Sequence, residues 1–199
     1  MSIDIKEIKR LKDLTGVGLT DAKNALEQSG GDFDKALEQM RKKGLTKAEK
    51  RGEREARQGL VATYNHDNRI GVVVELNCET DFVARNEIFG SLAKDIAMHI
   101  AASNPEYLSI DKVPSKDIEK IKAEFLDKAK ETNKPKEMIE NIVDNQVKKY
   151  FAEKCLLDQS FIKDPDMTIA DFVKENIAKL GENIVIRKFS RIALGEVVE

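Results

Sequence analysis

The sequence NCETDFVARNE occupies residues 77–87 and joins the most strand-prone run of the chain to a long helical pattern. Residues 70–76 are rich in valine and favour a β-strand, while residues 88–102 repeat apolar side chains at helical spacing. The stretch is therefore expected to be a strand-to-helix junction whose two ends are fixed by regular structure.

Two interpretations of this junction follow from its residue types. Thr80 is suited to cap a helix, which would place Asp81 and Phe82 in the first turn, where an acid also favours the helix dipole. In the first interpretation, Phe82 and Val83 are ordinary core residues of a capped helix. In the second, Phe82 is an exposed wedge and Asp81 is its charged neighbour. The residues alone leave both open.

Two further strand-prone runs complete the pattern of a small antiparallel sheet. Residues 60–64 are separated from residues 70–76 by a loop at 65–69, which predicts a hairpin. Residues 183–193 form a third run near the end of the chain. Helical patterns lie between the second and third strands, so we expect an α+β core over residues 59–199.

Residues 1–45 predict a bundle of three short helices separated by glycine-containing turns. Thr20 and Asp32 are suited to begin the second and third helices, and Gly44 is expected to end the third. About 45 residues is near the lower limit for a domain that folds alone.

The turn between the first two helices contains Val17, Gly18 and Leu19. Its glycines resemble a phosphate loop only superficially, because the lysine and hydroxyl side chain of such loops are missing and no strand precedes it. The turn either presents Val17 and Leu19 as an apolar patch for a partner, or uses both to close the bundle.

Residues 41–57 contain eight Lys or Arg against three Glu, although the whole chain has a net charge of only -2. Ala, Glu and Lys favour helix here, so residues 46–58 are interpreted as a basic helical linker. A nucleic-acid arm is the alternative, but the aromatic side chains that stack on bases are missing. We therefore expect no nucleic-acid partner.

Residues 115–151 predict a helical hairpin with one apolar stripe on each arm. Pro135 suits the first turn of the second arm. A final amphipathic helix over residues 168–180 is expected to end at Gly181. The stripes consist of Ile118, Ile121, Phe125 and Ala129, and of Ile139, Ile142, Val143, Val147 and Tyr150.

The two cysteines, Cys78 and Cys155, cannot form a disulfide framework, and with two histidines they make no complete zinc site. A reducing cytoplasm is the expected compartment, since no secretory signal or membrane span is apparent. Cys78, Asp81 and His99 are the grouping that would suit a cysteine-dependent hydrolase. His99 lies on an apolar face, however, which favours a satisfied, partly buried structural role.

Four segments resemble the elongation factor Ts family, in the family's order and over most of the chain: NCETDFVARNE, LTGVGLTDAKNALEQSGGDFDKALEQMRKKG, IAMHIAASNPEY and KPKEMIENIVDNQVKKYF. The resemblance implies a guanine-nucleotide exchange factor for the translation GTPase elongation factor Tu, in both its GDP-bound and nucleotide-free states. It also implies a ubiquitin-associated-like N-terminal domain and a projecting coiled-coil arm. No covalent step, cofactor or bound metal is implied.

The resemblance assigns roles to residues by their match to the family's motifs. The residues implicated in dislodging the partner's magnesium ion are Thr80, Asp81, Phe82 and Val83. The turn that meets the GTPase domain, with its nearby lysine, corresponds to Lys12, Val17, Gly18 and Leu19. His99 is implied to lie near the partner interface.

Longer members of the family contain two related core subdomains, whereas this chain has one set of three strands. We therefore predict a homodimer in which the cores associate through sheet or adjacent helix surfaces. The competing view is that the helical hairpin covers the sheet and keeps the chain monomeric. A ubiquitin-associated-type adaptor is a further functional alternative, but it leaves TDFV unexplained.

Overall fold

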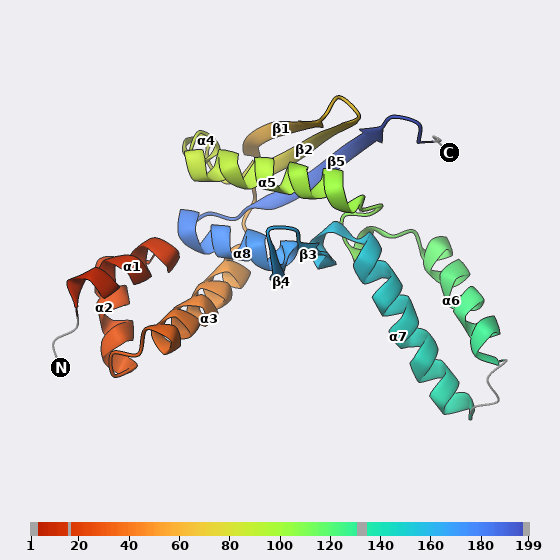
Figure 1. Cartoon of the computed structure of the whole chain (residues 1–199), viewed down its shortest axis with the longest axis horizontal. Coiled ribbons are helices and arrows are strands. Elements are labelled where there is room, and N and C mark those ends of the chain that lie inside the picture. Colours follow the sequence, from red (N-terminus) through yellow and green to blue (C-terminus); the bar gives the residue numbers. More distant parts are fainter. Residues whose placement is uncertain (1–3, 16, 131–134, 197–199) are drawn as a thin grey trace. The chain divides into compact units, whose positions relative to one another are not determined.

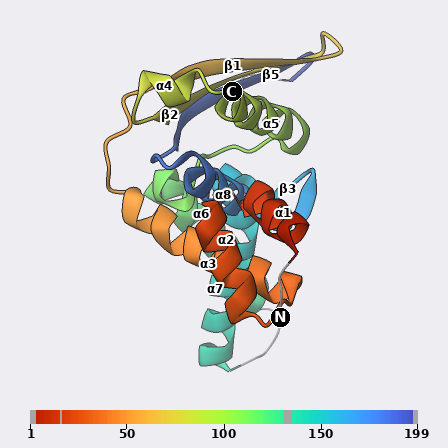
Figure 2. The same cartoon turned by 90° about the vertical axis from the view of Figure 1, so that its left-hand side faces the viewer.

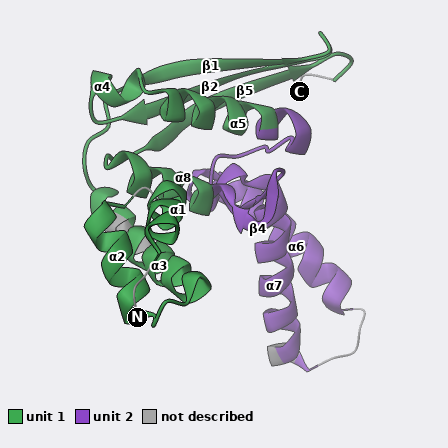
Figure 3. Ribbon diagram, turned by 60° about the vertical axis from the view of Figure 1, so that its left-hand side comes forward, with its two compact units in different colours: residues 1–98, 170–199 green, residues 99–169 purple. Residues whose placement is uncertain are grey.

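The computed structural model describes residues 4–15, 17–130 and 135–196, with the backbone alone for residues 45–47, 49, 136 and 137. Gly16 in the first turn and residues 131–134 between the hairpin arms therefore lie outside the described residues. The chain divides into two compact units (Figure 3). Unit 1 comprises residues 1–98 and 170–199, and unit 2 comprises residues 99–169.

Unit 1 begins with three helices, α1 (Ile5–Thr15), α2 (Leu19–Gln28) and α3 (Phe33–Arg51). The expected bundle of three N-terminal helices is thus present. Their apolar faces meet in one buried cluster, which consists of Ile8, Leu11, Ala22, Ala25, Leu26, Ala36 and Met40.

Capping explains where these helices begin. Asp32 accepts a hydrogen bond from Lys35 N at 3.1 Å, which confirms it as the cap of α3. The expected Thr20 cap was wrong, because α2 begins at Leu19 and the capping residue is Gly18. The expected end at Gly44 was also wrong, since α3 continues to Arg51. A helical glycine costs only about 1 kcal/mol, and the helix-forming residues that follow it favour continuation.

The core of unit 1 is a three-stranded antiparallel sheet, as the sequence predicted, and its strand order is β1-β2-β5. Its strands are β1 (Gln58–His66), β2 (Ile70–Cys78) and β5 (Val185–Ala193). The predicted loop at 65–69 shortens to a tight turn in which Asp67 and Asn68 have φ of 50° and 55°. Because β2 is the central strand, the junction that follows it begins from the best-supported part of the sheet.

The two faces of the sheet differ. Helix α5 (Glu87–Ser103) lies along one face (Figures 1 and 2). On the outer face, Val61, Val73 and Ile192 are 62%, 46% and 73% exposed. The buried side chains of β2 and α5 include Val72, Val74, Leu76, Phe89, Leu92 and Ile96.

Helix α8 (Ile169–Leu180) leads back into the sheet. Gly181, with φ of 81°, ends this helix, and its backbone N donates to Ile177 O at 2.9 Å. The predicted stop is therefore confirmed. The chain then passes through Glu182 and Asn183 before β5 begins at Val185.

Unit 2 contains the predicted helical hairpin, formed by α6 (Ser115–Lys130) and α7 (Lys136–Lys154). Lys122 Nζ lies 2.8 Å from Asp144 Oδ1, and the rings of Phe125 and Tyr150 meet edge to face, so the two arms contact each other along their length. Pro135 precedes the first turn of α7 rather than lying within it, which differs by one residue from the expectation.

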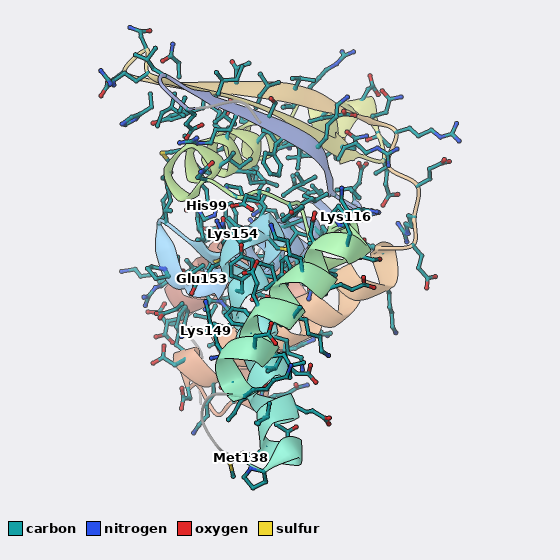
Figure 4. All side chains as sticks on the ribbon, turned by 90° about the vertical axis from the view of Figure 1, so that its right-hand side faces the viewer. His99, Lys116, Met138, Lys149, Glu153 and Lys154 are labelled. Atoms are coloured by element: carbon teal, nitrogen blue, oxygen red, sulfur yellow. The ribbon has the colours of Figure 1, made fainter. Side chains whose placement is uncertain are left out.

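The base of the hairpin packs around Val113, Phe151 and Cys155, which are buried together. Met138 lies near the opposite end of α7, away from His99 (Figure 4). Short elements complete unit 2: η1 (Ile110–Lys112), η2 (Leu156–Asp158), β3 (Ser160–Phe161) and β4 (Asp164–Thr168). The β3-β4 hairpin was not predicted, because a two-residue strand and a five-residue strand that contains a proline carry no clear strand pattern.

Candidate functional site

The junction after β2 is a helix capped at Thr80, as the sequence predicted, and this helix is a single turn. Thr80 has extended backbone angles, and its hydroxyl accepts a hydrogen bond from Val83 N at 3.4 Å. This cap begins α4 (Asp81–Ala84). The junction therefore reverses the chain direction between β2 and α5 within a few residues.

Each of the two interpretations of this junction is correct for one of two neighbouring residues. Phe82 is 81% exposed, as the wedge interpretation requires, whereas Val83 is buried, as the core interpretation requires. Asp81 Oδ2 lies 3.2 Å from Arg85 Nη2, with both side chains largely in solvent. Such an exposed pair contributes little to stability, so Asp81 remains accessible for pairing with another molecule.

Glu182, which belongs to the C-terminal segment of unit 1, forms hydrogen bonds with the junction. Its Oε2 accepts hydrogen bonds from the backbone N of Glu79 at 3.1 Å and of Thr80 at 3.0 Å. Its Oε1 accepts from Thr80 Oγ1 at 2.6 Å. Glu182 was not predicted from the sequence, because a contact between residues 102 positions apart leaves no local signal.

A reciprocal contact runs from Glu79 to Asn183. Glu79 Oε1 accepts from Asn183 N at 2.7 Å, and Glu79 Oε2 lies 3.5 Å from Arg54 Nη1. The buried Asn183 side chain donates to the backbone oxygens of Gly52 and Arg54 at 3.3 Å and 2.6 Å. The segment after α3, the junction and the start of β5 are thus bound into one polar network.

The cysteine-hydrolase hypothesis finds no support in this geometry. Cys78 is buried, its Sγ donates to Thr80 O at 3.1 Å, and burial with the nearby Glu182 carboxylate raises its pKa to about 11. Burial also raises the pKa of Cys155 to about 11. Both thiols are therefore protonated at neutral pH, whereas a nucleophilic cysteine needs a thiolate.

His99 is engaged inside unit 2, where Figure 4 labels it near the base of α7. Its Nε2 lies 3.0 Å from Gln159 Oε1, and its Nδ1 accepts from Ile162 N at 3.4 Å. Gln159 is in turn held by its donation to Glu153 O at 2.7 Å. The ring is completely buried and both ring nitrogens have hydrogen-bond partners, as the structural interpretation expects.

At the N-terminal turn, too, each of the two interpretations is correct for one residue. Leu19 is 54% exposed, whereas Val17 packs against the buried cluster of the bundle. Gly18 is exposed, and Lys12 is half-exposed with its Nζ 3.7 Å from Asp13 Oδ1. Leu19, Gly18 and the Lys12 ammonium are therefore accessible to solvent, whereas Val17 is partly buried against the bundle core.

The described residues were also compared with the requirements of a metal site and of a membrane-spanning helix. Within residues 4–15, 17–130 and 135–196, acidic, cysteine and histidine side chains form no group of three that could hold a metal ion. In that same part of the chain, every helix is too short or too polar to cross a membrane.

The junction thus presents an exposed phenylalanine on a capped turn of helix, a feature suited to contact with another macromolecule. Comparison with known proteins identifies the family. The family model described as Elongation factor TS matches residues 9–196. The chain belongs to the elongation factor Ts family and is a translation elongation factor.

Curated relatives agree over nearly the full length of the chain. Elongation factor Ts of Thermodesulfovibrio yellowstonii is 50% identical over 196 residues, covering 98% of each chain. Elongation factor Ts of Geobacter sulfurreducens is 47% identical over 200 residues, covering 100% of this chain and 93% of the relative. That of Syntrophomonas wolfei is 48% identical over 198 residues, covering 99% and 92%. The similarity therefore includes the N-terminal bundle as well as the core.

Proposed function

We propose that this chain binds elongation factor Tu in its GDP-bound and nucleotide-free states and accelerates GDP release. The observation that carries the proposal is Phe82, an aromatic side chain 81% exposed on a helix that is capped and held by hydrogen bonds. Covering a large exposed apolar side chain with a partner's apolar surface is favourable. A fixed junction allows that side chain to act as a wedge.

The mechanism requires no covalent step. Magnesium in a GTPase bridges phosphate and protein oxygens, so a group that displaces its ligands weakens nucleotide binding. In the proposal, Phe82 displaces partner side chains near the ion, and Asp81 exchanges its Arg85 contact for displaced polar groups of the partner. Thr80 and Val83 fix the backbone that presents them.

Thermodynamic linkage determines how strong this effect must be. If the nucleotide weakens binding of the factor, the factor weakens binding of the nucleotide by the same ratio. Each tenfold reduction in nucleotide affinity corresponds to about 1.4 kcal/mol of differential binding. The factor is released unchanged, so the proposed activity is exchange catalysis without chemistry on a substrate, and it takes place in the cytoplasm.

Anchoring is assigned to the N-terminal bundle. Leu19 offers an exposed apolar contact, Gly18 brings the backbone close to the surface, and the Lys12 ammonium adds a positive charge. Val17 supports this turn from behind through its packing on the bundle core. We place the first contact with the GTPase here, with the junction at residues 80–83 acting second. A ubiquitin-associated-type adaptor would not need the exposed Phe82.

We also propose that two copies associate through the outer face of the sheet. Val61, Val73 and Ile192 are exposed on this face, with the Lys188–Glu75 ion pair beside them at 3.6 Å. A second copy related by a two-fold axis would cover the apolar residues and would allow each lysine to meet a glutamate of its partner. The dimer would present two wedges.

The proposed activity is tested by the dissociation of a fluorescent GDP analogue from elongation factor Tu. We expect the rate to rise with the concentration of the chain and to saturate, and excess magnesium to oppose the effect. A dissociation rate that is independent of the chain would contradict the proposal.

A further inference from the structure

Glu182, in the segment between α8 and β5, is connected to the cap of α4 through a single hydroxyl group. Thr80 Oγ1 donates its proton to Glu182 Oε1 at 2.6 Å and accepts a hydrogen bond from Val83 N at 3.4 Å. A hydroxyl has one proton and two lone pairs, so both bonds are satisfied together. The carboxylate thereby fixes the orientation of the hydroxyl that caps the helix.

Helix α4 needs support from outside itself. It has four residues, fewer than an isolated helix requires for stability. Val83 is its buried residue, and Phe82 contributes little packing because it is mostly in solvent. The direction of the Phe82 side chain therefore depends on the backbone of Thr80 and on the few contacts that hold it.

We infer that Glu182 is a positioning residue for Phe82, which fixes Thr80 and the first turn of α4 so that the ring is presented in one orientation. This inference rests on the proposed function, since it names a residue that prepares the same wedge. Presenting a side chain in its bound orientation reduces the conformational entropy lost on binding. Charge-assisted bonds from a carboxylate are well suited to this role, because they are stronger than neutral ones.

The inference predicts a particular kinetic pattern for Glu182→Ala. We expect the saturating rate of GDP release to fall about tenfold, because the wedge would spend less time in its acting orientation. The concentration for half-saturation should change less than about threefold, because Leu19 and Lys12 still provide the anchor. A variant that is only less stable would instead lose active protein, without a selective fall in the saturating rate.

Matched variants separate the hydrogen bonds from the bulk of the side chain. Glu182→Gln keeps an oxygen for the two backbone N–H groups, and its amide can donate to Thr80 Oγ1, so it should stay close to the unmodified rate. Thr80→Val removes the connecting hydroxyl and should resemble Glu182→Ala. Combining the two changes should cost little more than either alone, because both break one connection. Glu106→Ala, which removes a carboxylate from an ion pair with Lys154 in unit 2, is the control.

A second readout does not depend on exchange activity. The chain contains no tryptophan, so Phe82→Trp creates a single fluorescent reporter at the wedge. In this background, Glu182→Ala should lower the fluorescence anisotropy of the indole well below the unfolding temperature, and Glu182→Gln should restore it. If Glu182→Ala does not fold, Thr80→Val provides the same comparison with the carboxylate in place.

The outcomes distinguish this inference from the proposed function. An unchanged anisotropy in the folded alanine or valine variant, or an unchanged saturating rate in Glu182→Ala, would overturn the positioning role of Glu182. A clear loss of anisotropy while the unmodified chain fails to release GDP would support the positioning role and refute exchange as the function.

Discussion

Phe82 and Val83 are adjacent in α4, yet Phe82 is 81% exposed and Val83 is 7% exposed. Their truncations should therefore affect different properties. Val83→Ala should lower the free energy of unfolding by about 1.5 kcal/mol, the typical effect of removing buried methyl groups. Phe82→Ala should change it by less than about 0.5 kcal/mol, as for other surface substitutions. Urea unfolding followed by circular dichroism checks both values, and equal losses would show that Phe82 packs inside the molecule.

The buried His99 makes the stability of the chain depend on pH. Burial lowers its pKa below the ordinary value of 6.5, although the Gln159 bond opposes this change. As the pH falls, the unfolded chain therefore takes up a proton before the folded chain does. The stabilisation is complete above about pH 6.5 and is lost as the pH falls through the pKa of the folded state.

This pH dependence is measured by urea unfolding at pH 7.5 and at pH 5.5. His99→Gln should show a smaller difference in unfolding free energy between these pH values than the unmodified chain. His66→Gln is the control, because His66 is exposed at the end of β1. A His99 variant with the full pH dependence would assign the effect to other groups.

The anchoring role of the N-terminal turn predicts an effect on affinity rather than on rate. Leu19→Ala combined with Lys12→Ala should raise the half-saturating concentration about tenfold or more and leave the saturating rate of GDP release nearly unchanged. Ile5→Ala, which removes another exposed apolar side chain from the opposite end of α1, is the matched control. An unchanged half-saturating concentration in the double variant would show that this turn does not anchor the GTPase.

The outer face of the sheet predicts the assembly state. Sedimentation equilibrium at micromolar concentration should give twice the chain mass of 22.4 kDa. Val61→Lys with Ile192→Lys should convert the protein to monomers, because paired copies would bring like charges together. Met138→Lys, on the exposed end of α7, should leave the dimer intact. A mass of 22.4 kDa for the unmodified chain throughout the concentration range would refute the dimer.

Local chemistry in the sequence predicted the elements that surround the site. Thr80 and Asp32 were recognisable caps, and Gly181 was a recognisable helix stop, because each acts on residues within one turn of itself. Thr20 and Gly44 were misinterpreted, since α2 begins at Leu19 with Gly18 as its cap and α3 continues through Gly44.

The exposure of individual side chains and the contacts between distant residues could not be predicted without the structure. The sequence left the direction of Phe82 open, because an apolar residue in a short helix is compatible with either environment. The bond from Glu182 to Thr80 depends on how β2 and β5 pair, which brings together residues that no local pattern links. The same pairing placed Val61 and Ile192 on one exposed face.

The central claim is that Phe82 drives nucleotide release by contact with the GTPase. Stopped-flow measurement of GDP-analogue dissociation from elongation factor Tu, at saturating concentrations of folded Phe82→Ala, tests it most directly. The account predicts a saturating rate at least about tenfold below that of the unmodified chain, at nearly unchanged stability of the factor. An undiminished rate from the stable variant would contradict it.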